Sequence, residues 1–189
     1  ASECFKKATE LRPDWAEGWA GLGTMQTRSS LHEEGVLSYK KSLSLKINQP
    51  RVHLSLGHVY KTTGSQENSI NSYKEAIHHD EDFGEAYWSL ANLKTYKFNS
   101  DELDEMEYRL SLKELPERER VHFLFSLGKG YEDIGVYEKS FEFYKQGNNL
   151  NRGRTSYDPK AIEALSNRLK NYFTTEVFAK RKECGFQSN

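Results

Sequence analysis

The sequence predicts an all-α protein made of repeated helical hairpins. Aligning the chain with itself at a shift of 34 residues superposes a large residue, a leucine and a small residue in three successive units. The triplets are Trp19, Leu22 and Gly23; His53, Leu56 and Gly57; and Tyr87, Leu90 and Ala91. A fourth triplet, Leu124, Leu127 and Gly128, follows 37 residues after the third. A fixed period of this kind indicates an array in which each unit packs against its neighbours.

Each unit is predicted to contain two helices. In the first helix, the large residue and the leucine share one face, and the following Gly or Ala allows the second helix to approach closely. In the second helix an aromatic residue precedes a small residue by three positions, as in Tyr39 with Ser42 and Tyr73 with Ala76. Tyr144 with Gly147 repeats this pair. We interpret these residues as packing between helices and not as a cofactor site.

The period divides the chain into an array and a tail. We predict a half repeat at 1–13, repeats at about 14–48, 49–82, 83–115 and 116–152, and capping helices with a linker at 153–189. Asp14, Ser30 and Asp82 are each followed three residues later by glutamate, which predicts side-chain caps at helix starts. Gly64 and Gly135 mark turns inside hairpins.

The tail is predicted to begin with a capped helix. Asp158 is the expected cap, Pro159 lies in the first turn, and Tyr157 is placed to pack on Ile162. The residues Ile162, Leu165, Leu169 and Tyr172 form an apolar stripe. We expect this stripe to cover the exposed end of the last repeat, because terminal repeats need a cover with a polar outer side.

These marks resemble the tetratricopeptide repeat over residues 1 to about 150. The resemblance implies a right-handed superhelix whose concave face is lined by the first helices and commonly receives a peptide. Gln26 and Lys94 stand where Tyr60 and Tyr131 supply an aromatic side chain. We therefore expect altered local packing and curvature, above all in the third unit.

A narrower resemblance covers the later repeats. Residues 87–94, 125–133, 144–152 and 157–159 are similar to the repeat region of bacterial fusions between tetratricopeptide repeats and a sulfotransferase. This resemblance implies a bacterial protein in which a catalytic domain follows residue 189. The half repeat at the start leads us to expect further repeats before Ala1.

Composition excludes several classes of partner. The net charge of −1 provides no field for nucleic acid or an anionic membrane. No apolar run is long enough to span a bilayer. Cys4 and Cys184 lie near opposite ends without metal-ligand spacing, which favours a reducing compartment, so we expect a cytoplasmic protein.

No local motif predicts catalysis, a cofactor or a metal. Gly128, Lys129 and Gly130 lack the spacing of a phosphate-binding loop. His78 and His79 precede Asp80 at a predicted helix end, where solvated polar residues are ordinary. We therefore expect no catalytic residues, no cofactor and no metal in this segment.

The predicted binding surface is the concave side of the first helices. We name it the groove face and assign to it the positions one, five and eight residues after each large core residue. The candidate partner-binding residues are Arg51, Leu54, His58, Lys61, Trp88, Asn92, Thr95, Phe125 and Lys129. Trp88 and Phe125 are either exposed anchors for a partner or residues buried by strong curvature; both readings stay open.

The favoured function is a scaffold that binds a protein or peptide in this groove, as the recognition part of a larger sulfotransferase. The alternatives are a structural or self-associating module, or a free-standing adaptor.

Overall fold

The computed structural model describes residues 2–154 and 158–181, so Tyr157 and Cys184 lie outside the described residues. Within the described ranges all regular structure is helical, which confirms the predicted class. The helices of the array are α1 (Ser2–Leu11), α2 (Ala16–Arg28), α3 (His32–Leu45), α4 (Pro50–Thr62), α5 (Gln66–His79), α6 (Gly84–Ala91), α7 (Ser100–Ser111), α8 (Glu117–Asp133) and α9 (Tyr137–Arg154). The remaining helices are α10 (Pro159–Tyr172) and α11 (Thr175–Lys180).

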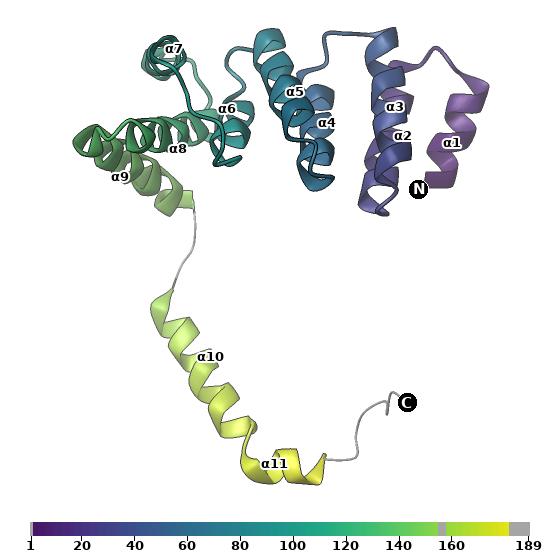
Figure 1. The fold of residues 1–189 in the computed structure, drawn as a ribbon. Coiled ribbons are helices and arrows are strands. Elements are labelled where there is room, and N and C mark those ends of the chain that lie inside the picture. Colours follow the sequence, from purple (N-terminus) through teal and green to yellow (C-terminus); the bar gives the residue numbers. More distant parts are fainter. Residues whose placement is uncertain (1, 155–157, 182–189) are drawn as a thin grey trace. The chain divides into compact units, whose positions relative to one another are not determined.

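Successive hairpins stand side by side in the array. Figure 1 shows α2 with α3, and α4 with α5, as neighbouring pairs that follow one another along the chain. Helix α1 packs against α2. A Cβ atom on Gly21 would clash with the ring of Phe5, so α1 lies closely against α2 at this point. That residues 1–13 are a half repeat stays a prediction.

The tyrosines of the second helices press against the glycines of the first helices. A Cβ atom on Gly57 would lie 2.4 Å from the ring of Tyr73, and one on Gly128 would lie 2.7 Å from the ring of Tyr144. Tyr73 is fully buried. The spacing of these residues therefore sets how closely the two helices of a hairpin approach, as the sequence predicts.

One residue in the left-handed backbone region ends the first helix of each regular hairpin. Ser30, Gly64 and Gly135 have φ angles of 62°, 79° and 78° and occupy equivalent positions of the repeat. The prediction that Ser30 caps α3 is wrong, because Ser30 forms this turn and Leu31 precedes the helix without a side-chain cap. The predicted caps at Asp14 and Asp82 are also wrong: α2 and α6 begin later, after Trp15 and Phe83, which make no side-chain cap bond.

The third unit departs from the pattern. Its first helix, α6, ends at Ala91, and the left-handed residue is Lys94 with φ 61°. Helix α7 then begins with a capping box in which Asn99 accepts from the Glu102 backbone N–H at 2.9 Å and Glu102 accepts from the Asn99 N–H at 3.0 Å. Helix α6 packs chiefly against α8. The expected distortion of this unit is thus an early end of its first helix.

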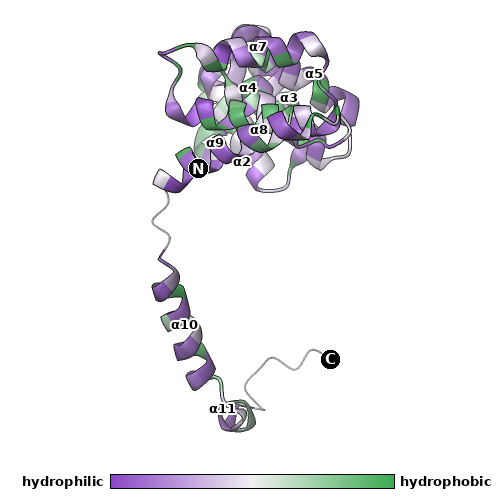
Figure 2. Ribbon diagram, turned by 90° about the vertical axis from the view of Figure 1, so that its left-hand side faces the viewer, coloured by the Kyte–Doolittle hydropathy of each residue, from purple (hydrophilic) through white to green (hydrophobic). Residues whose placement is uncertain are grey.

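Helices α10 and α11 belong to a second unit of the chain, which begins at Arg152. The predicted cap is confirmed, since Asp158 accepts from the Lys160 backbone N–H at 2.9 Å. Figure 2 shows hydrophobic residues interleaved with hydrophilic ones along α10. That the apolar stripe of α10 covers the last repeat stays a prediction.

None of the helices in the described part of the chain combines the length and apolar character needed to cross a membrane.

Candidate functional site

The candidate partner-binding residues fall mainly on the first helices. Arg51, Leu54, His58 and Lys61 belong to α4, Trp88 to α6, and Phe125 and Lys129 to α8, whereas Asn92 and Thr95 follow the early end of α6. The even spacing assumed from the sequence therefore fails after Ala91, because the helix stops there.

Trp88 and Phe125 form an aromatic pair between α6 and α8. Their ring centroids lie 5.5 Å apart with an interplanar angle of 46°. Both side chains are half-buried. Phe125 also lies 6.3 Å from the ring of Tyr144 on α9. The pair is therefore fixed by neighbouring helices on one side and partly open on the other, which is intermediate between the two alternatives left open by the sequence.

Tyrosine hydroxyls from the second helices form hydrogen bonds with residues of the groove face. The Tyr39 hydroxyl donates to Thr24 Oγ1 at 3.2 Å, and the Tyr144 hydroxyl donates to Glu132 Oε2 at 2.9 Å. His58 Nδ1 lies 2.8 Å from the Tyr73 hydroxyl. The sequence analysis treated these tyrosines as packing residues only. The sequence did contain a signal for these hydrogen bonds, because a polar residue, Thr24 or His58, stands 15 residues before Tyr39 and Tyr73.

Burial lowers the pKa of the His58 imidazole and raises the pKa of Tyr73. Burial also raises the pKa of Tyr144, with a contribution from the hydrogen bond to Glu132. These phenols are therefore protonated donors at neutral pH. They orient the groove-face side chains that they contact.

The remaining candidates differ in their availability. Arg51, Lys61 and Asn92 are exposed, and the Arg51 guanidinium lies 6.0 Å from the centroid of the Phe83 ring. Leu54 is only 6% exposed and belongs to the core, so little of its side chain is available to a partner.

Two candidates are engaged with neighbours in the chain. Lys129 forms an ion pair with Asp133 one turn later on α8. Thr95 accepts a hydrogen bond from Gln66 at the start of α5 and donates to the Leu93 carbonyl at 3.2 Å.

A hollow of about 240 Å³ lies beside His58, between the first two hairpins. Thr27, Arg28, His32 and Thr62 contribute to its wall. The Thr27 and Thr62 hydroxyls donate to carbonyls of their own helices, so they present acceptor oxygens to the hollow. The hollow therefore combines these hydrogen-bonding groups with the apolar side chains of Tyr39 and Val59.

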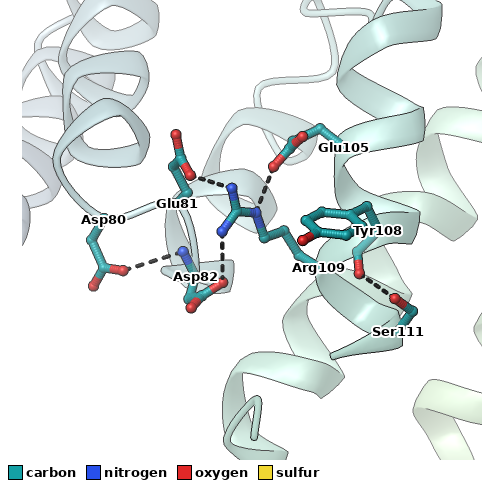
Figure 3. Close-up of polar contacts among 7 residues, drawn as sticks. All are labelled: Asp80, Glu81, Asp82, Glu105, Tyr108, Arg109 and Ser111. Atoms are coloured by element: carbon teal, nitrogen blue, oxygen red, sulfur yellow. Dashed lines mark hydrogen bonds and ion pairs between the residues drawn. The ribbon is translucent and has the colours of Figure 1, made fainter. Parts of the chain in front are cut away.

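An acidic cluster around Arg109 ties α7 to the turn between α5 and α6. Figure 3 shows the Arg109 guanidinium between the carboxylates of Glu81, Asp82 and Glu105. Asp82 lies 3.5 Å from Nη1. The hydrogen bond to Glu105 is the main cause of the raised pKa of Arg109. The cation is held by three anions inside one chain, which indicates a structural role.

Comparison with known proteins finds repeats of the same kind. The family model described as tetratricopeptide repeat matches residues 50–83, the hairpin of α4 and α5. A peroxisomal targeting signal receptor of Candida albicans is 38% identical over 77 residues, covering 41% of this chain and 12% of the receptor. The human protein O-mannosyl-transferase TMTC1 is 29% identical over 152 residues, covering 80% of this chain and 17% of the relative. The chain thus spans less than a fifth of the length of either relative.

Solved structures share the architecture at low sequence identity. A crystal structure of MamA matches with a TM-score of 0.62 and 20% identity, over 82% of this chain and 90% of MamA. YrrB, described as a TPR protein with an unusual peptide-binding site, matches with a TM-score of 0.50 and 16% identity, over 79% of this chain and 93% of YrrB. These matches and the helical hairpins confirm the predicted fold, an all-α superhelix of the tetratricopeptide type.

Proposed function

We propose that this chain is a protein-interaction scaffold and that its groove face binds a peptide or protein segment around the Trp88 and Phe125 rings. The observation that carries the proposal is the half-open aromatic pair, held at 5.5 Å between α6 and α8. In this role the chain positions a partner and performs no chemistry itself.

The physical reasoning concerns the cost of ordering an anchor. Both rings are already fixed by contacts with neighbouring helices, so a partner that covers their open sides loses little additional side-chain entropy on binding. Large aromatic residues in such positions often contribute about 2 kcal/mol or more to an interface. Exposed Asn92 lies one turn after Trp88 in the sequence and offers both a donor and an acceptor to a backbone.

The comparisons support the same class of function. YrrB is described by its peptide-binding site, and the Candida relative is a receptor for a targeting signal. Tetratricopeptide arrays are solenoids, whose extended concave surfaces are used for binding. The partner of this chain is therefore proposed as a protein or peptide, with no nucleic acid and no membrane as ligand.

The test begins with peptides selected against the wild-type chain from a random display library. Trp88→Ala and Phe125→Ala are each expected to weaken the selected peptides by about 30-fold, the equivalent of about 2 kcal/mol. Phe141→Ala is the matched control, because Phe141 is a 68% exposed phenylalanine on α9 outside the groove face. Equal affinities for all four proteins would contradict the proposed site.

Self-association is the second candidate, and a specific patch favours it. Near the start of α9, Ile134, Tyr137 and Phe141 are 51%, 67% and 68% exposed. Clustered apolar exposure is typical of an interface. A molecular mass that rises with concentration in the wild type but not in Phe141→Ser would support this function. A concentration-independent monomer mass would exclude it.

We also propose the finer assignment that the array is the recognition part of a larger bacterial, cytoplasmic sulfotransferase. It rests on the resemblance of residues 87–94, 125–133, 144–152 and 157–159 described above. The coding sequence after residue 189 should then encode a strand followed by a glycine-rich phosphate loop. A different continuation would contradict this assignment and leave the proposed groove untouched.

A further inference from the structure

Three potential metal ligands meet inside the second hairpin. His53 comes from α4, and Glu75 and His79 lie one turn apart on α5. One ring nitrogen of each histidine and one carboxylate oxygen of Glu75 all lie within 4.8 Å of one another. The two imidazole rings are stacked, with centroids 5.0 Å apart and an interplanar angle of 27°.

The surroundings of His53 leave one of its nitrogens available. His53 is 7% exposed, and its Nε2 lies 3.1 Å from the carbonyl oxygen of Ile47. Because a carbonyl only accepts hydrogen bonds, Nε2 carries the proton and Nδ1 carries the lone pair. A backbone carbonyl that fixes the tautomer in this way is the usual outer partner of a metal-bound histidine.

The surroundings of His79 point in the same direction. Its side chain is 15% exposed, and its Nε2 is buried without a hydrogen-bond partner among the described residues. Glu75 Oε2 lies 3.9 Å from this nitrogen, too far for a hydrogen bond. A buried nitrogen with an unused lone pair or proton is unfavourable, and coordination to a cation would satisfy it.

Other repeats place ordinary residues at these positions. One period earlier, the residues equivalent to His53, Glu75 and His79 are Trp19, Lys41 and Leu45. In that repeat the Trp19 indole N–H donates to the Pro13 carbonyl at 2.9 Å, the equivalent of the bond from His53 to Ile47, and Leu45 has no polar group. The second nitrogen of His53 and the imidazole of His79 therefore have no counterpart there. The second repeat replaces two apolar residues with imidazoles and adds a carboxylate beside them.

We propose that His53, Glu75 and His79 bind one divalent transition-metal ion, with zinc as the occupant that best suits the donors. Two imidazole nitrogens and one carboxylate oxygen are a donor set that zinc takes readily, whereas magnesium and calcium prefer oxygen alone. Water completes the coordination. The ion joins α4 to α5 and so fastens the second hairpin.

The geometry requires a modest closure around the ion. Ligand atoms about 2.0–2.1 Å from zinc in a tetrahedral site lie roughly 3.3 Å from one another. The separations of up to 4.8 Å must therefore shorten, and Glu75, with a 55% exposed side chain, is free to move inward. His53 keeps its place through Ile47.

The experiment uses the whole chain without a polyhistidine tag, treated with a chelator and with both cysteines alkylated so that thiolates do not compete. Zinc is titrated by calorimetry, and cobalt(II) is added in parallel to report the coordination geometry by visible absorption. We expect one equivalent of zinc per chain and a higher melting temperature in its presence.

The variants copy residues that neighbouring repeats already carry. His79→Leu and His53→Trp introduce the amino acids found at the equivalent positions of the first repeat, so both variants are expected to fold. Each should weaken zinc binding by about tenfold or more. His78→Gln is the matched control, because His78 neighbours His79 but is not part of the cluster.

Unchanged binding in His79→Leu, an equal loss in His78→Gln, or no binding by the wild type would each overturn the proposal. Circular dichroism establishes folding of each variant before titration. A variant that folds and loses zinc while His78→Gln retains it supports the site.

Discussion

Replacing Gly84 with alanine tests the contact on which the proposed anchor depends. Gly84 begins α6, and a Cβ atom on it would lie 2.6 Å from the carbonyl oxygen of Glu119 on α8. The same atom would lie 3.1 Å from His122 and from Phe123. The nearest neighbour is backbone and cannot rotate away, so α6 and α8 must separate by about 0.8 Å to restore an ordinary contact of about 3.4 Å.

The size of the effect follows from two opposing contributions. Overpacking of this kind costs about 1–3 kcal/mol. Alanine recovers up to about 1 kcal/mol of helix propensity, and less in the first turn. We therefore expect Gly84→Ala to lower the free energy of unfolding by about 1–2 kcal/mol. Gly153→Ala is the control, because nothing lies within 4 Å of a Cβ atom there and only the propensity gain remains.

The assay is urea unfolding followed by circular dichroism and by tryptophan fluorescence. Trp15→Phe and Trp19→Phe in the background leave Trp88 as the reporter of the contact between α6 and α8. A local probe is needed because repeat arrays do not always unfold in one cooperative step. If Gly84→Ala shifts the Trp88 transition no further than Gly153→Ala does, the close approach of these helices is wrong.

Three further substitutions test the turns, the hairpins and the electrostatics. Ser30→Gly should stabilise the chain by up to about 1 kcal/mol in thermal unfolding, because glycine adopts the left-handed φ of 62° without strain. Ser29→Gly is the control and should not stabilise the chain, because the φ of Ser29 is −95°. Ser69→Ala should lower the free energy of unfolding in urea by about 1 kcal/mol, because the buried Ser69 hydroxyl donates to the carbonyl of Gly57 at 2.9 Å. An unchanged urea midpoint would show that this hydrogen bond makes no net contribution to stability. For Glu119, burial alone would raise the pKa, but the His122 imidazole, with Nδ1 3.7 Å away, and a hydrogen bond from the Glu85 backbone N–H at 3.2 Å outweigh it and lower the pKa below 4.5. The unfolded chain then takes up the proton first as the pH falls, so the stability present above about pH 4.5 is lost as the pH falls through the folded pKa. Between pH 5 and 3, wild type should lose more of its free energy of unfolding than Glu119→Gln, and parallel pH profiles would contradict the assignment.

The period was sufficient to predict the hairpins, because helix packing depends on residue size at fixed spacing. Gly57 and Tyr73, for example, are identified by their place in the repeat, and the structure brings them together. Helix caps were not predictable in the same way. Ser30 has the right side chain and the right distance to a glutamate, but a cap also requires an extended backbone, and the left-handed φ of Ser30 removes it. The alignment of Ser30 with Gly64 and Gly135 in the repeat indicated that Ser30 adopts a left-handed backbone conformation.

The candidate site was predicted less completely than the fold. Position in the repeat correctly placed Trp88 and Phe125 on first helices, but it could not show that Leu54 is buried in the core. The exposure of a side chain depends on the size of the residues that face it from adjacent helices. The position of a residue in the repeat does not specify those neighbours. The cluster of His53 with His79 was missed because its members belong to different helices and share no local motif.

The irregular third unit and the aromatic pair have a common structural basis. Lys94, not the residue one turn later, takes the left-handed conformation, and α6 ends at Ala91. The short helix packs chiefly against α8, which brings Trp88 to 5.5 Å from Phe125. The equivalent positions in the first two units hold small Ala20 and buried Leu54, so neither offers a comparable ring. Binding energy on the groove face should therefore concentrate where the repeat is least regular, and lengthening α6 to match the other units would separate the two rings.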